Sequence, residues 1–451
     1  MTLKVLFSNP PWWDGSFLYK NGAGQEATGY VAGVRAGSRW PFTLHLATPP
    51  DQYSFGSYLP YPFFMGYAAT YAAKATGAQM VFRDSIAMRE SYERYFAFLM
   101  QEKFDYVVIE SATPSWSHDK VIIQQIERFS PNTKVIITGP IASIGKQILD
   151  EAPIHAGVRG EYEKGVVKVL NGATGLIDHD LLTVDEMNGS PFPYFDDVIA
   201  HRYIDMNPRG VQTPQAHVWS SRGCPYKCIF CVWPATMTGN DPTGTGKRTV
   251  RHYSGDYMEA FLTELVQKYG YRSIYFDDDT FNLGDKHVEK MCAVMRKLGV
   301  PWSAMCRADT SRMELWQEMK DSGCFGVKLG FESGNQHVVD NIVNKHLDLE
   351  YARKAVTECK RVGLTVHGTF TYGLPGETHE QMLETRRYKD SLGLDTFQES
   401  GTAEIEGTPL HTLSSQKAMK KYSGAHVDDD YIRETDGRVK FDKLRASLEG
   451  A

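Results

Sequence analysis

Cysteine is scarce and unevenly placed in this 451-residue sequence, with none before residue 224 and none after residue 359. The total of seven is odd and three of them lie close together, so the pattern does not indicate a disulfide framework. The other four are scattered, and we expect each to be a small core hydrophobe: Cys292, Cys306, Cys324 and Cys359.

Long apolar runs and basic blocks are absent as well. No run approaches the roughly 20 apolar residues that cross a bilayer, and the N-terminal stretch Met1-Thr-Leu-Lys-Val-Leu-Phe7 is typical of a first strand rather than of a signal peptide. We therefore expect a cytoplasmic protein without a membrane span. The net charge is −6 and no Lys/Arg stripe occurs, which argues against nucleic acid as a partner.

The cysteines that do occur together are Cys224, Cys228 and Cys231, in a C-x3-C-x2-C spacing. Three thiolates from one loop suit three corners of a [4Fe–4S] cluster, which leaves the fourth iron open. A zinc site is the alternative, but it needs a distant fourth ligand such as His217 or His252, and the usual paired C-x2-C motifs are missing. Unligated core cysteines are a weaker alternative, so the cluster is the preferred interpretation.

The first 170 residues alternate short apolar runs with helical patterns. This order predicts an α/β fold with a Rossmann-like, doubly wound parallel sheet, whose ligands bind at the carboxyl ends of the strands. The expected strands are 3–8, 78–82, 106–110, 133–138 and 155–158, and the expected helices are 65–76, 92–103, 118–129 and 162–170.

Two irregular stretches interrupt this order. An insert at 12–60 is rich in aromatic residues and glycine, and we expect it to be a lid that covers a ligand or the neighbouring domain. Residues 171–213, with several glycines and prolines, are expected to be a linker.

A second alternation of strands and helices runs from 214 to 410 and predicts a partial (β/α)6 barrel, followed by a polar cap or tail at 411–451. The expected strands are 217–220, 273–276, 302–306, 326–331, 365–371 and 396–405. Polar motifs follow them. Three adjacent carboxylates in Phe276-Asp-Asp-Asp-Thr-Phe281 are costly unless they face cations or hydroxyl groups, although a metal site or a solvated turn is an alternative. Arg307, at the end of another strand, is placed to neutralise a carboxylate.

Together these features resemble the radical S-adenosylmethionine (SAM) enzymes. The resemblance rests on the C-x3-C-x-aromatic-C loop after a strand and on Gly330-Phe-Glu-Ser-Gly334, Gly373-Leu-Pro-Gly-Glu-Thr378 and Glu406-Gly-Thr-Pro409 at strand ends, so it covers about 220–410. It implies that the amino and carboxylate groups of SAM chelate the open iron, and that Phe230 lies near the adenine. The other residues implied in SAM binding are Asp277, Asp278, Arg307, Gly330, Glu332 and Ser333.

The N-terminal half resembles the cobalamin-binding domain that precedes the barrel in one branch of these enzymes. The resemblance implies cobalamin contacts from the loops after the strands: Asn9, Pro10, Ser111, Thr113, Gly139, Gly160 and Glu161. The Asp-x-His-x-x-Gly signature that gives a histidine to cobalt is absent, as is common in this branch. A Rossmann-like domain that serves only as a scaffold is the alternative.

The resemblance implies C-methylation of an unactivated carbon through a 5′-deoxyadenosyl radical and methylcobalamin. A radical cyclase, oxidase or rearrangement enzyme that transfers no methyl group is the alternative, and a non-catalytic iron–sulfur carrier is a third. Expected cofactors are a [4Fe–4S] cluster, SAM and cobalamin. Expected partners are a small-molecule or peptide substrate and an electron donor such as flavodoxin or ferredoxin. Without further cysteines, neither the extra N-terminal cluster of methylthiotransferases nor auxiliary C-terminal clusters are available.

Overall fold

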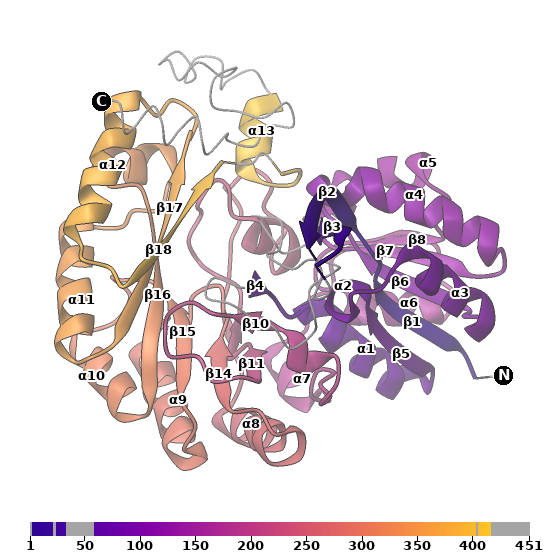
Figure 1. Ribbon diagram of the computed structural model, residues 1–451, viewed down its shortest axis with the longest axis horizontal. Coiled ribbons are helices and arrows are strands. Elements are labelled where there is room, and N and C mark those ends of the chain that lie inside the picture. The colour runs from indigo at the N-terminus through magenta and orange to yellow at the C-terminus, as the bar shows by residue number, and fades with distance from the viewer. Residues whose placement is uncertain (1, 21–23, 33–57, 403–404, 416–451) are drawn as a thin grey trace.

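The computed structural model describes residues 2–20, 24–32, 58–402 and 405–415. They form two lobes, each built on a six-stranded parallel sheet with helices beside it (Figure 1). The chain is therefore an α/β protein, as the sequence predicts.

The first sheet has the strand order β5-β1-β6-β7-β8-β9 and every pairing in it is parallel. Because the order reverses between β1 and β6, the sheet is doubly wound. Its strands are β1 (Lys4–Asn9), β5 (Gln79–Asp84), β6 (Tyr106–Glu110), β7 (Lys134–Thr138), β8 (Ala156–Val158) and β9 (Gly175–Ile177).

Helices lie on both faces of this sheet because neighbouring strand residues point to opposite sides and both sides are apolar. One face joins a hydrophobic core that continues into the second lobe, whereas the other has a separate core that includes Leu6 and Ile109. The helices are α1 (Phe63–Thr76), α2 (Ser85–Met88), α3 (Tyr92–Glu102), α4 (Thr113–Phe129), α5 (Gln147–Glu151) and α6 (Glu163–Leu170).

The second sheet has the order β11-β14-β15-β16-β17-β18, in which each strand pairs in parallel with the next. This is the predicted six-unit partial barrel. Its strands are β11 (Gln215–Val218), β14 (Ser273–Phe276), β15 (Trp302–Cys306), β16 (Cys324–Glu332), β17 (Thr365–Tyr372) and β18 (Thr396–Gly401). Its helices are α8 (Gly255–Tyr269), α9 (Asp285–Leu298), α10 (Glu314–Asp321), α11 (Leu349–Arg361), α12 (His379–Ser391) and α13 (Pro409–Ser415).

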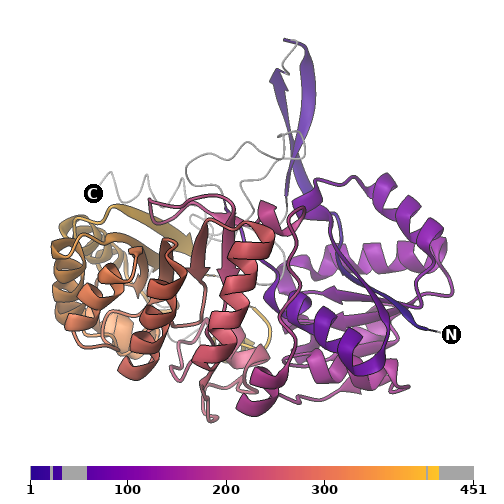
Figure 2. The ribbon, with the colours of Figure 1, turned by 90° about the horizontal axis from the view of Figure 1, so that it is seen from below.

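The stretches expected to be irregular contain regular structure. Within the predicted aromatic insert, β2 (Trp13–Lys20) and β3 (Glu26–Ala32) form an antiparallel hairpin that projects away from the body (Figure 2). The rest of that insert, at 33–57, lies outside the described residues, so the prediction of a lid is not tested there. Within the predicted linker lie strand β9 of the first sheet and α7 (Val184–Gly189).

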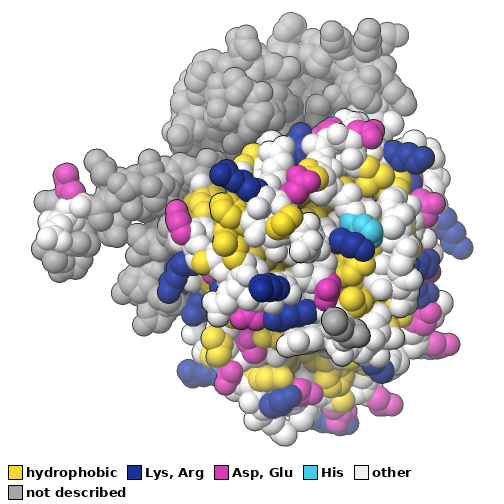
Figure 3. All heavy atoms as spheres, turned by 90° about the vertical axis from the view of Figure 1, so that its right-hand side faces the viewer, with side chains coloured by type: hydrophobic (Ala, Val, Ile, Leu, Met, Phe, Trp, Pro, Cys, Tyr) yellow, Lys and Arg dark blue, Asp and Glu magenta, His cyan; other side chains and the backbone are white. Residues whose placement is uncertain are grey.

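The lobes are joined by more than the linker. The short strand β4 (Tyr58–Leu59) pairs antiparallel with β10 (Ile204–Asp205), which immediately precedes the barrel. On the face in Figure 3, positive and negative side chains are interspersed and no basic patch gathers. No described helix combines the length and apolar character needed to cross a membrane.

Candidate active site

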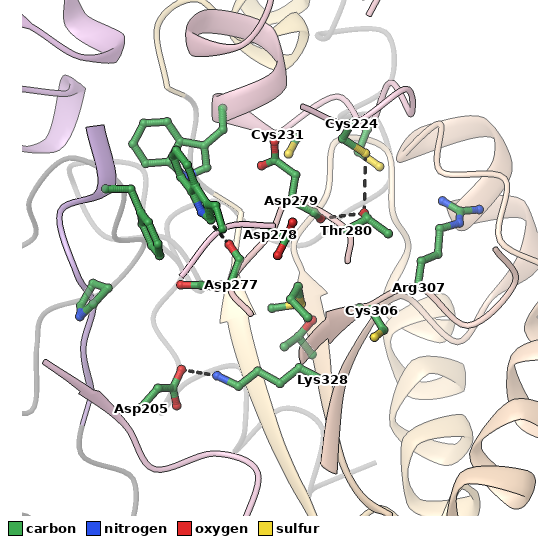
Figure 4. Close-up of a pocket in the computed structure, with 18 of the residues that line it drawn as sticks. Asp205, Cys224, Cys231, Asp277, Asp278, Asp279, Thr280, Cys306, Arg307 and Lys328 are labelled. Atoms are coloured by element: carbon green, nitrogen blue, oxygen red, sulfur yellow. Dashed lines mark hydrogen bonds and ion pairs between the residues drawn. The ribbon is translucent and has the colours of Figure 1, made fainter. Parts of the chain in front are cut away.

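A cavity lies where the two lobes meet, at the carboxyl ends of the barrel strands. Its empty volume is about 1640 Å³, solvent at its mouth included. All six barrel strands, or the loops that follow them, contribute to its wall, and the first lobe contributes Tyr58, the segment 60–64 and Glu110. Figure 4 shows a part of it, with Cys224 and Cys231 at one end and the Asp205–Lys328 pair at the other.

The three predicted cluster cysteines all line this cavity. Backbone hydrogen bonds anchor their loop to its surroundings. The Ile229 N–H donates to the Val343 carbonyl (3.0 Å), the Leu410 N–H donates to the Ile229 carbonyl (2.9 Å), and the Arg248 guanidinium donates to the Tyr226 carbonyl (2.8 Å). The loop therefore presents all three thiols to one space.

Burial raises the pKa of the Cys224 thiol to about 11 and also raises the pKa of Cys228. Both thiols are therefore protonated at neutral pH unless a metal displaces the proton. Within the described ranges, no three Cys, His, Asp or Glu side chains lie close enough to hold one metal ion. A cubane cluster binds each thiolate through a different iron, so it suits three cysteines that do not converge on one point.

The structure does not support the zinc alternative, because neither proposed fourth ligand lines the cavity that the three cysteines share. His217 lies on β11 and contacts the Gln215 side chain (3.0 Å), whereas His252 stacks on His287 (ring centroids 4.2 Å apart). The four remaining cysteines are buried, as expected of core residues, although Cys306 also borders the cavity.

Two of the three adjacent carboxylates hold the chain just before the cysteine loop. Asp278 accepts hydrogen bonds from the hydroxyl groups of Ser220 (2.9 Å) and Ser221 (2.5 Å), and Asp279 accepts one from the Gly223 N–H (3.2 Å). Burial raises their pKa values, to about 6 for Asp278 and about 7 for Asp279. Asp278 is therefore part of a buried hydrogen-bond network, not of a solvated turn.

The third carboxylate, Asp277, has other neighbours. Tyr275 donates a hydrogen bond to it, and its charge interacts with Lys328 and Asp205. Burial raises its pKa to about 6, against the opposing effect of Lys328. It thus belongs to the end of the cavity that is remote from the cysteines.

Glu332 ends β16 beside the proposed cluster site. Its carboxylate accepts hydrogen bonds from Lys345 Nζ (2.9 Å) and Thr371 Oγ1 (2.9 Å). Its φ of 67° is unusual for a residue other than glycine, and the ladder to β17 is irregular between Gly330 and Glu332. Such strained positions persist where the surroundings fix a functional side chain.

Arg307 directly follows β15 and neutralises a carboxylate, as expected. It forms two hydrogen bonds to Asp309 (2.5 and 2.9 Å), donates to the His346 carbonyl (2.9 Å) and lies over the Tyr226 ring (3.7 Å). Its guanidinium therefore stiffens the cavity wall beside the cysteine loop.

Of the three remaining residues of the predicted SAM site, Gly330 lines the cavity on β16. Phe230 lines the cavity and packs in a hydrophobic cluster with Ile229 and Leu374. Ser333 does not line the cavity; its hydroxyl contacts the Thr385 hydroxyl (2.8 Å) on α12. A direct contact between Ser333 and SAM is thus disfavoured, because its side chain is committed to helix packing.

Sequence reasoning missed the deep end of the cavity, which Asp205, Lys328, His367, Gln398 and Ser400 line. The signal for Lys328 was present, since it alternates with Gly330 and Glu332 along a predicted strand and therefore faces the same side. Asp205 gave no signal because it lies within the predicted linker.

The residues predicted to contact cobalamin are not part of the cavity wall. Asn9 donates to Asp84 (2.7 Å), Ser111 donates to Asp119 (2.5 Å), and Thr113 accepts a hydrogen bond from the Glu406 N–H (3.0 Å). These side chains tie loops together instead of facing an open space. The set comprises Asn9, Pro10, Ser111, Thr113, Gly139, Gly160 and Glu161.

The glycines of that set are required by the backbone itself. Gly139 has a φ of 88°, and a Cβ there would lie 2.5 Å from the Ser111 carbonyl oxygen. Gly160 has a φ of 72°, and a Cβ there would lie 2.5 Å from the His179 ring. Close packing explains both glycines without a ligand.

Glu161 forms part of a buried charge cluster between the lobes, which we call the clamp: Glu161, Glu163, Arg222 and Arg251. Arg222 donates to Glu163 (2.6 Å) and lies 3.4 Å from Glu161, which also pairs with Arg251. Arg222 precedes Cys224 by two residues. The clamp thus ties the first lobe to the cysteine loop.

Comparison with protein families supports this geometry. Residues 220–388 match the model of the Radical SAM superfamily. An uncharacterised methyltransferase of Pyrococcus horikoshii is 28% identical over 68% of this chain and 69% of its own length. A cytidylyl-2-hydroxyethylphosphonate methyltransferase of Streptomyces wedmorensis is 25% identical over 58% of this chain, and the match spans only 48% of that protein.

Solved structures share the fold. The radical SAM methyltransferase TsrM of Kitasatospora setae, with tryptophan and a SAM analogue bound, superimposes with a TM-score of 0.65 over 85% of each chain at 14% identity. The cobalamin-dependent radical enzyme OxsB, with aqua-cobalamin and SAM bound, gives a TM-score of 0.63 over 87% of this chain and 64% of its own, also at 14% identity.

Proposed function

Because residues 220–388 form a radical SAM domain, we propose that this chain is a cobalamin-dependent radical SAM enzyme that methylates an unactivated carbon of its substrate. One observation carries the proposal. The cavity that holds Cys224, Cys228 and Cys231 is closed on its other side by the N-terminal lobe. A second large cofactor bound against that lobe would lie within reach of the first.

We propose that the three cysteines hold three irons of a [4Fe–4S] cluster and that SAM lies between them and β16. Phe230 offers an apolar face for the adenine, and Glu332 offers carboxylate oxygens to the methionyl or ribose hydrogen-bond donors. A side chain at Gly330 would collide with this carboxylate, because a Cβ there would lie 2.8 Å from Glu332 Oε1. The roles of these residues are predictions.

We further propose that cobalamin lies against the N-terminal wall of the same cavity. Proline and aromatic rings dominate this wall, and Phe63 stacks on Trp219 across it with ring centroids 4.3 Å apart. Flat apolar rings fit the faces of a corrin macrocycle. The described N-terminal residues of this wall include no histidine, in keeping with the missing Asp-x-His-x-x-Gly signature.

When bound, the cluster and SAM supply a 5′-deoxyadenosyl radical that removes a hydrogen atom from the substrate, and cobalamin supplies the methyl group. The chain itself contributes position and exclusion of water. Asp278 and Asp279 fix the segment before Cys224, and the clamp holds the two walls of the cavity together. Fixed walls keep reacting groups aligned and shield them from solvent.

The finer predictions remain proposals. They include the division into a cobalamin domain (1–170), a linker (171–213), a barrel (214–410) and a cap (411–451). They also include a cytoplasmic location, a small-molecule or peptide substrate, and an electron donor such as flavodoxin or ferredoxin.

The test uses protein purified without oxygen, reconstituted with iron and sulfide, and supplied with cobalamin. It is incubated with methyl-labelled SAM and a low-potential reductant, with the Cys228→Ala variant as the blank. We expect label in the corrinoid fraction, S-adenosylhomocysteine as its co-product, and 5′-deoxyadenosine from reductive cleavage. None of these products should form in the blank.

Two results would contradict the proposal in different ways. Formation of 5′-deoxyadenosine without S-adenosylhomocysteine would leave a radical cyclase, oxidase or rearrangement enzyme. Absence of both products, with the cluster intact, would leave a non-catalytic iron–sulfur protein.

A further inference from the structure

The cavity continues beyond the proposed SAM site into the barrel. Along β16 the alternate residues Lys328, Gly330 and Glu332 line it, so Lys328 lies about 13 Å further along the strand than Glu332 at 3.3 Å per residue. At Gly330 a Cβ would lie 2.8 Å from both Glu332 Oε1 and Lys345 Nζ. The Glu332–Lys345 ion pair thus fills the position that a side chain at Gly330 would take. The deep part of the cavity lies beyond this pair, toward Lys328.

One wall of this deep space is polar but uncharged. The register places His367 beside Lys328, Thr369 beside Gly330, and Gln398 beside Thr369. Burial and the nearby Lys328 lower the pKa of His367 to about 3, so its ring is neutral at physiological pH. This wall offers hydrogen bonds without charge.

The adjoining part of the wall has unequal charges. Lys328 forms a buried ion pair with Asp205 and lies over the Tyr275 ring (4.6 Å). Asp277 adds a second carboxylate beside this pair, whereas Asp278 and Asp279 are occupied by the chain before Cys224. In Figure 4, Asp277 lies between the Asp205–Lys328 pair and the cysteine end. One cation therefore serves two carboxylates.

We propose that the deep end of the cavity binds the substrate through a cationic nitrogen, such as a protonated amine, that pairs with Asp277. Thr369 and Gln398 then contact neutral polar groups of the same molecule. The inference rests on the proposed function, because the substrate has to lie within reach of the radical. It goes further by naming a class of small amines.

Charge balance favours an amine over an anion here. A cation would complete an alternating set with Asp205, Lys328 and Asp277, whereas a carboxylate or phosphate would add to an existing negative excess in a poorly solvated space. Aromatic faces also attract cations. Trp219, whose indole N–H donates to the Asp277 carbonyl (2.9 Å), and Tyr275 both line this part of the cavity.

Three probes with one ring and three charges test the proposal: benzylamine, benzyl alcohol and benzoate. Their affinities for the reconstituted, SAM-bound protein are measured by titration calorimetry at neutral pH. We expect benzylamine to bind about tenfold more tightly than benzyl alcohol, since a hydrogen-bonded charge is worth at least that factor. Benzoate should bind least well.

Variants assign the preference to Asp277. Asp277→Asn should remove the advantage of benzylamine and leave SAM affinity unchanged, whereas the matched exposed control Asp321→Asn should alter neither. Gln398→Lys adds a second cation that balances the two carboxylates, so it should also remove the preference for benzylamine, and it keeps the test valid if Asp277→Asn fails to fold.

Equal binding of the three probes, no measurable benzylamine binding, or tighter binding of benzoate would overturn the inference. So would an Asp277→Asn variant that loses SAM affinity and keeps benzylamine affinity, because Asp277 would then belong to the SAM site. These are equilibrium measurements without turnover. A failure of methyl transfer would therefore contradict the proposed function and leave this inference intact.

Discussion

The carboxyl ends of the two parallel sheets make different use of similar residues. At the end of the first sheet, Asn9 and Ser111 donate side-chain hydrogen bonds to Asp84 and Asp119 within the same lobe. At the end of the barrel sheet, Asp277 and Glu332 line a cavity. The comparison teaches that a polar residue after a strand marks a ligand site only where neighbouring loops leave space in front of it.

The largest effect is expected from the cysteines, when a predicted cluster ligand and a core cysteine are each replaced by alanine. Cys224→Ala should abolish cluster assembly and SAM cleavage, because the cysteine loop then offers two thiols instead of three. The matched variant Cys359→Ala, in the barrel core, should retain the cluster and lose about 1 kcal/mol of stability from its small cavity. Iron content, sulfide content and 5′-deoxyadenosine formation measure both. A full cluster in Cys224→Ala would contradict the site.

In the clamp, the first lobe places two glutamates against Arg222, two residues before Cys224. Arg222→Met leaves Glu163 without its cation and Glu161 with Arg251 alone, and a buried ion pair broken in this way costs about 3–5 kcal/mol. Lys297→Met removes an exposed partner of Glu259 and should cost at most about 1 kcal/mol. Urea denaturation compares the two.

The rate of iron loss tests whether the clamp also positions the cysteine loop. If the clamp positions the cysteine loop, Arg222→Met should also lose iron faster to a chelator, whereas Lys297→Met should behave as the unaltered protein. A midpoint of unfolding for Arg222→Met equal to that of Lys297→Met would refute the role of the clamp.

The loop after β17, at the edge of the barrel, also contains a buried carboxyl group. Burial raises the pKa of Glu377 from 4.5 to about 8, and one of its oxygens has no hydrogen-bond partner in the described structure. The folded state therefore keeps a proton that the unfolded chain releases above pH 4.5. Stability should fall by about 1.4 kcal/mol for each pH unit between those two pKa values, and change no further above the folded one.

Glu377→Gln should remove this loss, so its advantage over the unaltered protein should grow from pH 5 to about pH 8 and then stay constant. Thermal unfolding across this pH range measures it. A constant difference at every pH would show that the carboxyl group is not buried in its neutral form.

The smallest expected effect lies at the first sheet. Ser111→Ala removes one hydrogen bond to Asp119 and should cost about 1 kcal/mol of stability, with corrinoid affinity changed less than about twofold. Spectroscopic titration with cobalamin measures the affinity. A tenfold loss of cobalamin affinity would indicate that cobalamin binds at the strand ends of the first sheet, as the sequence alone predicts. The two sheets would then both bind ligands at their strand ends.

The sequence predicted most of the fold. Strands β6, β14 and β15 match their predicted bounds because each is a short apolar run between breakers. Strand β9 was missed because it has three residues among glycines, and the hairpin was missed because an aromatic-rich stretch offers no clear period. Local sequence patterns do not predict a strand that is stabilised only by pairing with neighbouring strands.

The site was predictable where one stretch of chain carries it. The cysteine loop and Glu332 were found because their motifs are contiguous. The clamp was not, because Glu163 and Arg222 lie 59 residues apart and only folding joins them. The burial of Ser333 against α12 and the enclosure of Asn9 and Ser111 likewise depend on packing that no local pattern records.

The corrinoid content of the purified chain is the most direct test of whether this protein binds cobalamin. The protein is isolated without oxygen from cobalamin-fed cells, the cluster is reconstituted, and corrinoid is assayed after denaturation. We expect about one corrinoid per chain, bound against the aromatic wall of the cavity. A chain that cleaves SAM but carries no corrinoid would contradict it, and the N-terminal lobe would then be a scaffold.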